Sequence, residues 1–302
     1  MTDAATDLAP RDRALDRAAG DRVVAVELET WGTPRAAAAV LSREGVLGSA
    51  GDTTVLHPWA SVTKVVAALA VLDVVRDGCL RLDDEVGPNG ATVRHLLAHT
   101  SGLSLDGDRV VAQPGQRRIY SNAGIEVVVA EACRRSGADS AADLVAARVL
   151  EPLGMARTRL AGPAAHGLEG PLDDLVLLAA ELLAPRVLAP GWVDAAVAPT
   201  FPSVAGVLPG FGRQDPNDWG LGIELRGHKS PHWMPPGASP SAFGHFGQSG
   251  SFVWVDRREG VACATLTGRP FGPWAVECWP RSGARWLARF GANATTELGG
   301  QR

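Results

Sequence analysis

The spacing of apolar residues predicts which segments of the chain are strands and which are helices. Apolar and polar residues alternate over Arg22–Glu29, which predicts a strand, and a Gly-Thr-Pro turn then leads to a second predicted strand over Ala36–Leu41. Before them, a proline and a glycine bracket a short predicted helix over Arg11–Ala19. The long apolar run Ser61–Val75 predicts a buried helix, and Gly78 suits the left-handed turn that follows a helix.

The middle of the chain has helical spacing, and strand patterns return near the end. Helices are predicted over Thr92–Ala98, Asn122–Ser136, Ala141–Val149, Leu172–Leu183 and Gly191–Val197. Strands are predicted over Trp219–Leu225, Ser251–Val255 and Val261–Leu266, and a last amphipathic helix within Ala275–Phe290.

This order predicts an α/β (α+β) fold. We expect an antiparallel sheet built from both termini and flanked by the terminal helices, with an all-helical region inserted between its second and third strands. The sheet part would comprise residues 1–60 and 200–302 and the mostly helical part residues 61–199, as one unit with the active site between the two parts.

The composition limits which binding partners and which cellular compartment we expect for the protein. The 302 residues are 46% hydrophobic and carry a net charge of −4 without any basic stripe, so no nucleic-acid partner is expected. No apolar run approaches the ~20 residues of a membrane helix, and the acidic start is unlike a signal peptide. We therefore expect a cytoplasmic protein with no membrane partner. Four widely spaced cysteines without a C-x-x-C pair are predicted to be free thiols.

Two rare residue types point to candidate chemistry. Only Lys64 and Lys229 among the 29 basic residues are lysines, and Tyr120 is the sole tyrosine. Arginine cannot deprotonate to act as a base, and phenylalanine has no hydroxyl. A chain that avoids lysine and tyrosine should keep them where these properties are needed.

The first candidate motif is S-x-x-K, formed by Ser61 and Lys64 at the start of the long apolar helix. The spacing puts both side chains on one helix face, one turn apart. The helix N-terminus directs backbone N–H groups toward the serine, and a partly buried lysine can have a lowered pKa and act as its base. The pair taken alone also fits a solvated helix face or a cap.

Two further motifs follow along the chain. Tyr120-Ser121-Asn122 enters a predicted helix and can project a phenol and a carboxamide into a cleft, although a helix cap explains it equally. Gly244-His245-Phe246-Gly247-Gln248-Ser249-Gly250 precedes a predicted strand and leaves room for a substrate beside the backbone, although an ordinary hairpin turn also fits.

These three motifs, in this order, resemble the family of serine β-lactamases and penicillin-binding-protein-like hydrolases. The nearest branch is similar to class C β-lactamases, D-aminopeptidases and related esterases. Supporting signatures are His99-Thr100-Ser101-Gly102-Leu103, Leu80-Arg81-Leu82-Asp83-Asp84, Pro114-Gly115 and Glu151-Pro152-Leu153-Gly154-Met155. The resemblance runs from about Val23 to Phe290.

The resemblance implies a role for each motif. Ser61 would be the acylated nucleophile, and Lys64 and Tyr120 would share the proton transfers. Asn122 would bind the substrate or hold Lys64. The backbone amides of Ser61 and Gln248 would form the oxyanion hole. His245, Phe246 and Gly247 would replace the family's K-T-G triplet and contact the substrate; here histidine stands for lysine and phenylalanine for threonine.

The expected function is a serine hydrolase, an esterase or amidase acting on small neutral acyl substrates, with no cofactor. The alternatives are an acyltransferase for a small metabolite, a D-amino-acid peptidase or β-lactamase-like hydrolase, and a ligand-binding member without turnover. His228 and His232 have a zinc-like spacing but enclose Pro231 and lack a third ligand, so no metal site is expected. The natural substrate and the oligomeric state cannot be derived from these motifs.

Overall fold

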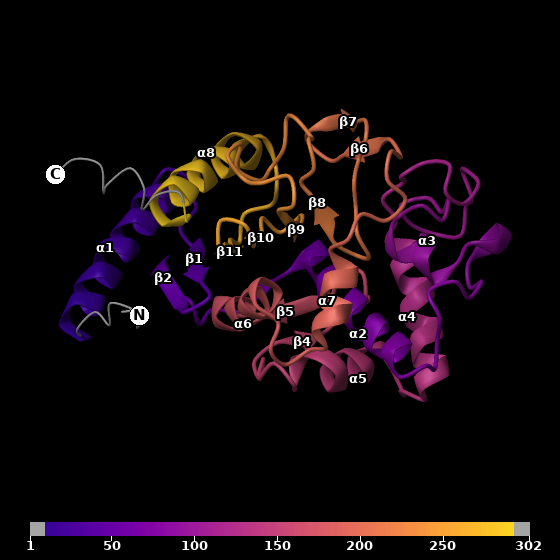
Figure 1. The fold of residues 1–302 in the computed structure, drawn as a ribbon. Helices are drawn as coiled ribbons and strands as arrows, with labels where there is room; N and C mark the ends of the chain where they lie inside the picture. Colours follow the sequence, from indigo (N-terminus) through magenta and orange to yellow (C-terminus); the bar gives the residue numbers. More distant parts are fainter. Residues whose placement is uncertain (1–9, 293–302) are drawn as a thin grey trace, which may run out of the picture.

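A six-stranded antiparallel sheet forms the centre of the protein (Figure 1). The computed structural model describes residues 10–292, with side chains from residue 16. The strand order is β2-β1-β11-β10-β9-β8, so a strand from the amino-terminal part pairs with one from the carboxyl-terminal part, as predicted. The strands are β1 (Ala37–Ser42), β2 (Gly45–Ala50), β8 (Glu224–Leu225), β9 (Phe243–Phe246), β10 (Phe252–Asp256) and β11 (Val261–Leu266).

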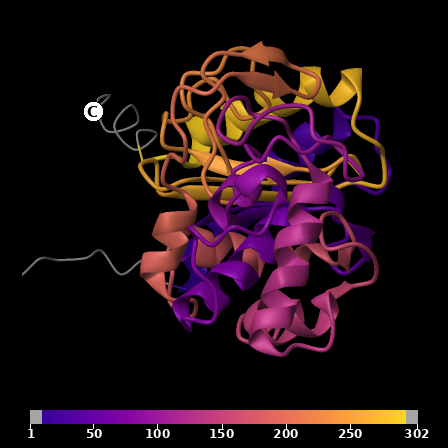
Figure 2. The same cartoon turned by 90° about the vertical axis from the view of Figure 1, so that its right-hand side faces the viewer.

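Helices cover both faces of this sheet (Figure 2). Helices α1 (Pro10–Glu29) and α8 (Pro273–Phe290) cover one face, and α2 (Thr63–Arg76) and α6 (Leu172–Leu183) lie on the other. Side chains of the strands alternate between the two cores, because successive residues of a strand point to opposite faces. The predicted α/β class with an antiparallel sheet is therefore confirmed.

The inserted region contains more than helices, which corrects the prediction. Besides α2 and α6, its helical elements are η1 (Ala60–Val62), η2 (Pro88–Gly90), α3 (Val93–Leu97), α4 (Asn122–Ser136), α5 (Ala141–Val145), η3 (Ala146–Leu150) and α7 (Pro190–Ala196). A small sheet of β3 (His57–Pro58), β5 (Leu168–Gly170) and β4 (Arg159–Leu160) packs among them, and β6 (Gly206–Leu208) pairs with β7 (Gly212–Gln214). These strands are two or three residues long, too short for a periodic signal.

The predicted strand over Arg22–Glu29 is wrong, because α1 continues through it to Glu29. Val24 and Leu28 are buried four residues apart, as on one helix face, whereas Val26 is 56% exposed. Gly20 does not end the helix. It lets strand β2 approach, since a Cβ there would lie 2.0 Å from the Leu47 carbonyl oxygen.

Three other elements differ from the prediction. Of the predicted strand Trp219–Leu225, only its last two residues form β8, because the chain first makes a tight turn that brings Trp219 opposite Glu224. Strand β2 was not predicted, since its residues carry no clean alternation. The last helix begins at Pro273 and passes through Pro280.

Helix α2 runs through the interior below the sheet. Eleven of its fourteen residues are buried, because its apolar side chains surround the helix instead of forming one stripe. Lys64, in the first turn of α2, carries an ionisable group among these apolar side chains and is 0% exposed. Its burial in an apolar helix requires polar partners, and these define the candidate site.

Candidate active site

Ser61 lies where the chain turns into helix α2. The preceding Ala60 has φ +45°, in the left-handed region that residues other than glycine seldom adopt. The amide of Val62 donates to the Trp59 carbonyl at 3.2 Å and closes this turn. As a result the Ser61 side chain borders a cavity, whereas the residues that follow it in α2 are buried.

The ammonium group of Lys64 is surrounded by three acceptors. Its Nζ donates to Ser61 Oγ at 3.2 Å, to Asn122 Oδ1 at 2.7 Å and to the Ala165 carbonyl at 2.9 Å. Burial lowers the pKa of Lys64 to about 7, although two nearby carboxylates act in the opposite direction. A lysine with this pKa is present in both protonation states near neutral pH, so it can accept the serine proton.

Helix α4 positions two of these three acceptors. Asn122 is its first residue, and its Nδ2 donates to Asp106 Oδ1 at 2.9 Å, so its Oδ1 is directed to the lysine. One turn later, Glu126 accepts the amides of Ala164 at 3.2 Å and Ala165 at 2.7 Å. This contact holds the loop whose carbonyl accepts from the lysine.

Tyr120 is enclosed by rings and by the lysine. The ring centroids of His99 and Trp219 lie 4.6 Å and 5.8 Å from its own, and Lys64 Nζ lies 4.8 Å from the ring centre. Burial raises the pKa of Tyr120 well above its usual value, although a hydrogen bond with Ser61 opposes the rise. Tyr120 is therefore a neutral phenol at pH 7, suited to relaying a proton.

His245, on strand β9, lies next to the Tyr120 hydroxyl. Its Nδ1 lies 2.7 Å from the Phe246 carbonyl oxygen, which can only accept, so we assign the ring proton to Nδ1. Nε2 is then an acceptor, 3.5 Å from the Tyr120 hydroxyl. Burial, with the charge of Lys64, lowers the pKa of His245 to about 3, so the ring is neutral.

Gly247 brings the β9–β10 connection against the backbone that precedes Ser61. A Cβ on Gly247 would lie 2.5 Å from the Trp59 carbonyl oxygen, so only glycine fits. The Ser251 hydroxyl donates to the same carbonyl at 2.6 Å. In the described part of the chain, the amides of Ser61 and Gln248 donate to no backbone carbonyl. Both are available to an oxyanion.

Phe246 lies largely in the core rather than in open contact with a substrate. It is 7% exposed, and its ring centroid lies 4.8 Å from that of Phe271 and 5.6 Å from that of Trp233. Successive residues of β9 point to opposite faces, so His245 faces the tyrosine while Phe246 faces helix α8. Its edge still borders the cavity.

The predicted site residues come together around one cavity of about 280 Å³. It is lined by Ser61, Leu105, Tyr120, Asn122, Leu208, Pro209, Trp219, Glu224, His245, Phe246 and Gln248. Lys64 lies beneath Ser61, and Gly247 supports the wall from behind. The sequence analysis missed the wall residues Leu105, Leu208, Pro209 and Glu224, because loops and strands of two or three residues carry them and such segments have no periodic signal.

The second lysine is bound to the wall residue Glu224. Lys229 is 3% exposed and donates to Glu224 Oε1 at 2.8 Å and to Asn217 Oδ1 at 3.1 Å. His232 Nε2 lies 2.9 Å from the same carboxylate oxygen, so this histidine has a carboxylate partner. Within residues 10–292, no three His, Cys, Asp or Glu side chains are grouped as metal ligands.

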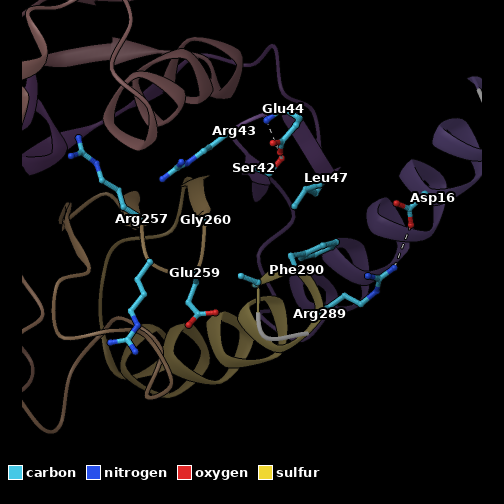
Figure 3. A pocket seen from close by; sticks show the side chains of 13 residues that line it. Asp16, Ser42, Arg43, Glu44, Leu47, Arg257, Glu259, Gly260, Arg289 and Phe290 are labelled. Atoms are coloured by element: carbon cyan, nitrogen blue, oxygen red, sulfur yellow. Dashed lines mark hydrogen bonds and ion pairs between the residues drawn. The ribbon is translucent and has the colours of Figure 1, made fainter. Parts of the chain in front are cut away.

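A larger cavity of about 520 Å³ lies elsewhere, between α1, α8 and the β1–β2 and β10–β11 turns (Figure 3). It contains Ser42, but this hydroxyl donates to Glu44 Oε2 at 2.6 Å and no lysine or tyrosine lines the cavity. Its walls carry arginines and carboxylates together. We therefore place the candidate chemistry at Ser61.

A serine and a lysine one helical turn apart, with a buried tyrosine beside them at the edge of an antiparallel sheet, define the β-lactamase/transpeptidase-like class of fold. The model of the β-lactamase family matches residues 21–281. The chain therefore belongs to the β-lactamase family.

Comparisons with solved structures agree with this assignment. A β-lactamase from Mycobacterium bovis is 45% identical over 88% of this chain and 99% of its own, with a TM-score of 0.86. Two more distant structures share the fold. A mutant of simvastatin synthase from Aspergillus terreus is 16% identical over 95% and 99% of the two chains (TM-score 0.72). EstCE1, described as a hydrolase with promiscuous acyltransferase activity, is 15% identical over 87% and 99% (TM-score 0.71).

A search of curated proteins found no match. Within residues 10–292, each helix is too short or too polar to span a bilayer.

Proposed function

We propose that this protein is a serine hydrolase that forms an acyl-enzyme on Ser61, and that its substrates are small neutral esters or amides. The observation that carries the proposal is the buried Lys64, with a pKa of about 7 and its Nζ 3.2 Å from Ser61 Oγ. A surface lysine would keep its proton near neutral pH, whereas this one can take the proton of the serine.

The proton transfers follow from the contacts. Neutral Lys64 takes the Ser61 proton as Oγ attacks the acyl carbon, and the amides of Ser61 and Gln248 bind the oxyanion. When the bond to the leaving group breaks, Tyr120 gives its proton to the leaving oxygen or nitrogen and is reprotonated by the Lys64 ammonium. Water then attacks the acyl carbon by the same relay and releases the acid.

The charges around the cavity support neutral substrates. No arginine or lysine is among the residues that line the cavity in the described part of the chain. Lys64 and Lys229 are each bound to three acceptors, and Arg118 donates to four backbone carbonyls. His245 is neutral. A substrate carboxylate would thus lack a charge-assisted partner, which typically costs ~1.5–3 kcal/mol.

The test of the nucleophile compares two serine variants. We expect Ser61→Ala to abolish hydrolysis of p-nitrophenyl butyrate and fluorophosphonate labelling, read by intact mass. Ser42→Ala, which removes the serine of the larger cavity, should leave both unchanged. Tyr120→Phe should lower kcat/KM by about 10²-fold or more, the usual scale for a proton-transfer group. Wild-type turnover in Ser61→Ala would refute the proposal.

The test of substrate charge compares p-nitrophenyl butyrate with nitrocefin, a β-lactam that carries a carboxylate. Wild type should prefer the neutral ester, and His245→Lys, which restores a cation, should shift the ratio toward nitrocefin about tenfold or more. Phe246→Thr is a poorer probe, since emptying its place in the core costs about 3 kcal/mol of stability. A wild-type preference for nitrocefin would contradict the neutral class.

Acyl transfer is a second candidate. Because the cavity walls are largely apolar, an organic alcohol or amine could compete with water beside the acyl-enzyme. Adding butanol to the ester assay measures this competition, since transfer forms butyl butyrate in place of butyric acid.

A further inference from the structure

Leu105 is an exposed apolar residue held at the mouth of the candidate active site. Its side chain lines the cavity and is nevertheless 51% exposed. Its carbonyl accepts the amides of Asn122 at 2.7 Å and Ala123 at 3.2 Å. The residue is therefore fixed to the start of helix α4, beside the carboxamide that contacts Lys64, and does not lie on a loose loop.

Further apolar residues line the same cavity. Leu208 and Pro209, from the β6–β7 hairpin, line it together with the edge of Phe246. Ser61 and Tyr120, which carry the reactive hydroxyl groups, line the same cavity. A ligand that reaches the serine can therefore contact apolar wall residues as well.

We propose that this mouth is a subsite for an unbranched alkyl chain of the substrate, and that Leu105 determines the preference for chain length. The proposal rests on the proposed function and deepens it. An alkyl chain lying between Leu105 and Leu208 would remove the exposed leucine surface from water. Each methylene buried there should raise kcat/KM about three- to fourfold, until the chain extends beyond Leu105. The chain can be carried by the acyl group or by the alcohol.

The test uses p-nitrophenyl acetate, butyrate and octanoate with two matched variants. Leu105→Ser removes the proposed contact, and Leu56→Ser alters a leucine of similar exposure (52%) that does not line this cavity. We expect Leu105→Ser to lower the octanoate-to-acetate ratio of kcat/KM at least about fivefold. Leu56→Ser should leave the ratio unchanged.

A second series of ethyl, butyl and octyl acetate places the chain on the alcohol. A Leu105-dependent loss in either series supports the subsite and identifies the side that carries the chain. The proposal is overturned if neither series responds to Leu105→Ser, or if Leu56→Ser changes the ratios equally.

A third measurement separates this proposal from the proposed function. Labelling of Ser61 by ethyl and octyl fluorophosphonates, followed by intact mass, needs no turnover. If no ester is hydrolysed, the proposed function fails. The subsite is still supported if the octyl probe labels wild type faster than the ethyl probe does and this difference is lost in Leu105→Ser. Equal labelling rates for the two probes in wild type and in Leu105→Ser overturn it.

Discussion

The pKa of Lys64 gives a quantitative prediction for the pH dependence of acylation. Only the neutral amine can take the Ser61 proton, so kcat/KM should rise with pH while Lys64 loses its proton. With a pKa of about 7, the amine is about one-tenth neutral at pH 6 and about nine-tenths neutral at pH 8. We therefore expect kcat/KM for p-nitrophenyl butyrate to rise roughly tenfold between these values and then level off.

Neighbouring groups should add no second transition in this range. His245 has its pKa lowered to about 3, and the pKa of Tyr120 is raised far above neutral. Stopped-flow or initial-rate assays from pH 5.5 to 9, with fluorophosphonate labelling in parallel, measure the profile. A flat profile would show that Lys64 is not the base, and a rise centred near pH 10 would show that the pKa of Lys64 is not lowered.

The Asp106 carboxylate provides a test of what sets the pKa of Lys64. Its charge raises the pKa of Lys64, so Asp106→Asn should move the rise in kcat/KM to lower pH. Asp108→Asn removes a charge from the same exposed loop without that influence and should leave the midpoint where it is. Identical midpoint shifts in both variants would mean that general surface charge, not a specific neighbour, controls the base.

Three further predictions concern the frame of the site and the fold. Gly247→Ala should lower kcat/KM by about 10²-fold, measured with the butyrate ester, because the added methyl group displaces the segment that carries an oxyanion donor. Lys229→Met should cost ~3–5 kcal/mol in urea unfolding, since it leaves Glu224 buried without its cation; a loss below ~1 kcal/mol would contradict this. Val24→Ala should destabilise clearly while Val26→Ala changes little, and equal losses would restore the strand prediction.

The local patterns predicted those elements whose periodicity is strong. Helices α4 and α6 begin and end where the spacing places them, because each has one apolar face and clear limits. The prediction failed at α1. The alternating residues Val24, Val26 and Leu28 are also compatible with a helix if that helix continues through Gly20, as α1 does. Contact with β2 decides between the two, and no local pattern contains that contact.

The sequence by itself determined the chemical groups of the site. The order of the S-x-x-K, Y-x-N and His-Phe-Gly motifs, and the scarcity of lysine and tyrosine, identified Ser61, Lys64, Tyr120 and His245, which the fold brings to one cavity. These motifs are local, so their residue types and spacing can be recognised without knowing the fold.

The tertiary structure alone decided what those groups can do. The pKa of Lys64 depends on burial and on the carboxylates of Glu126 and Asp106. Its hydrogen-bond partners Asn122 and Ala165 lie 58 and 101 residues further along the chain. Whether Phe246 faces a substrate or the core depends on which side of β9 is covered by α8. The walls of the cavity come from loops that meet only in the folded chain. Burial and long-range contact set these properties, and neither can be derived from the local order of residues.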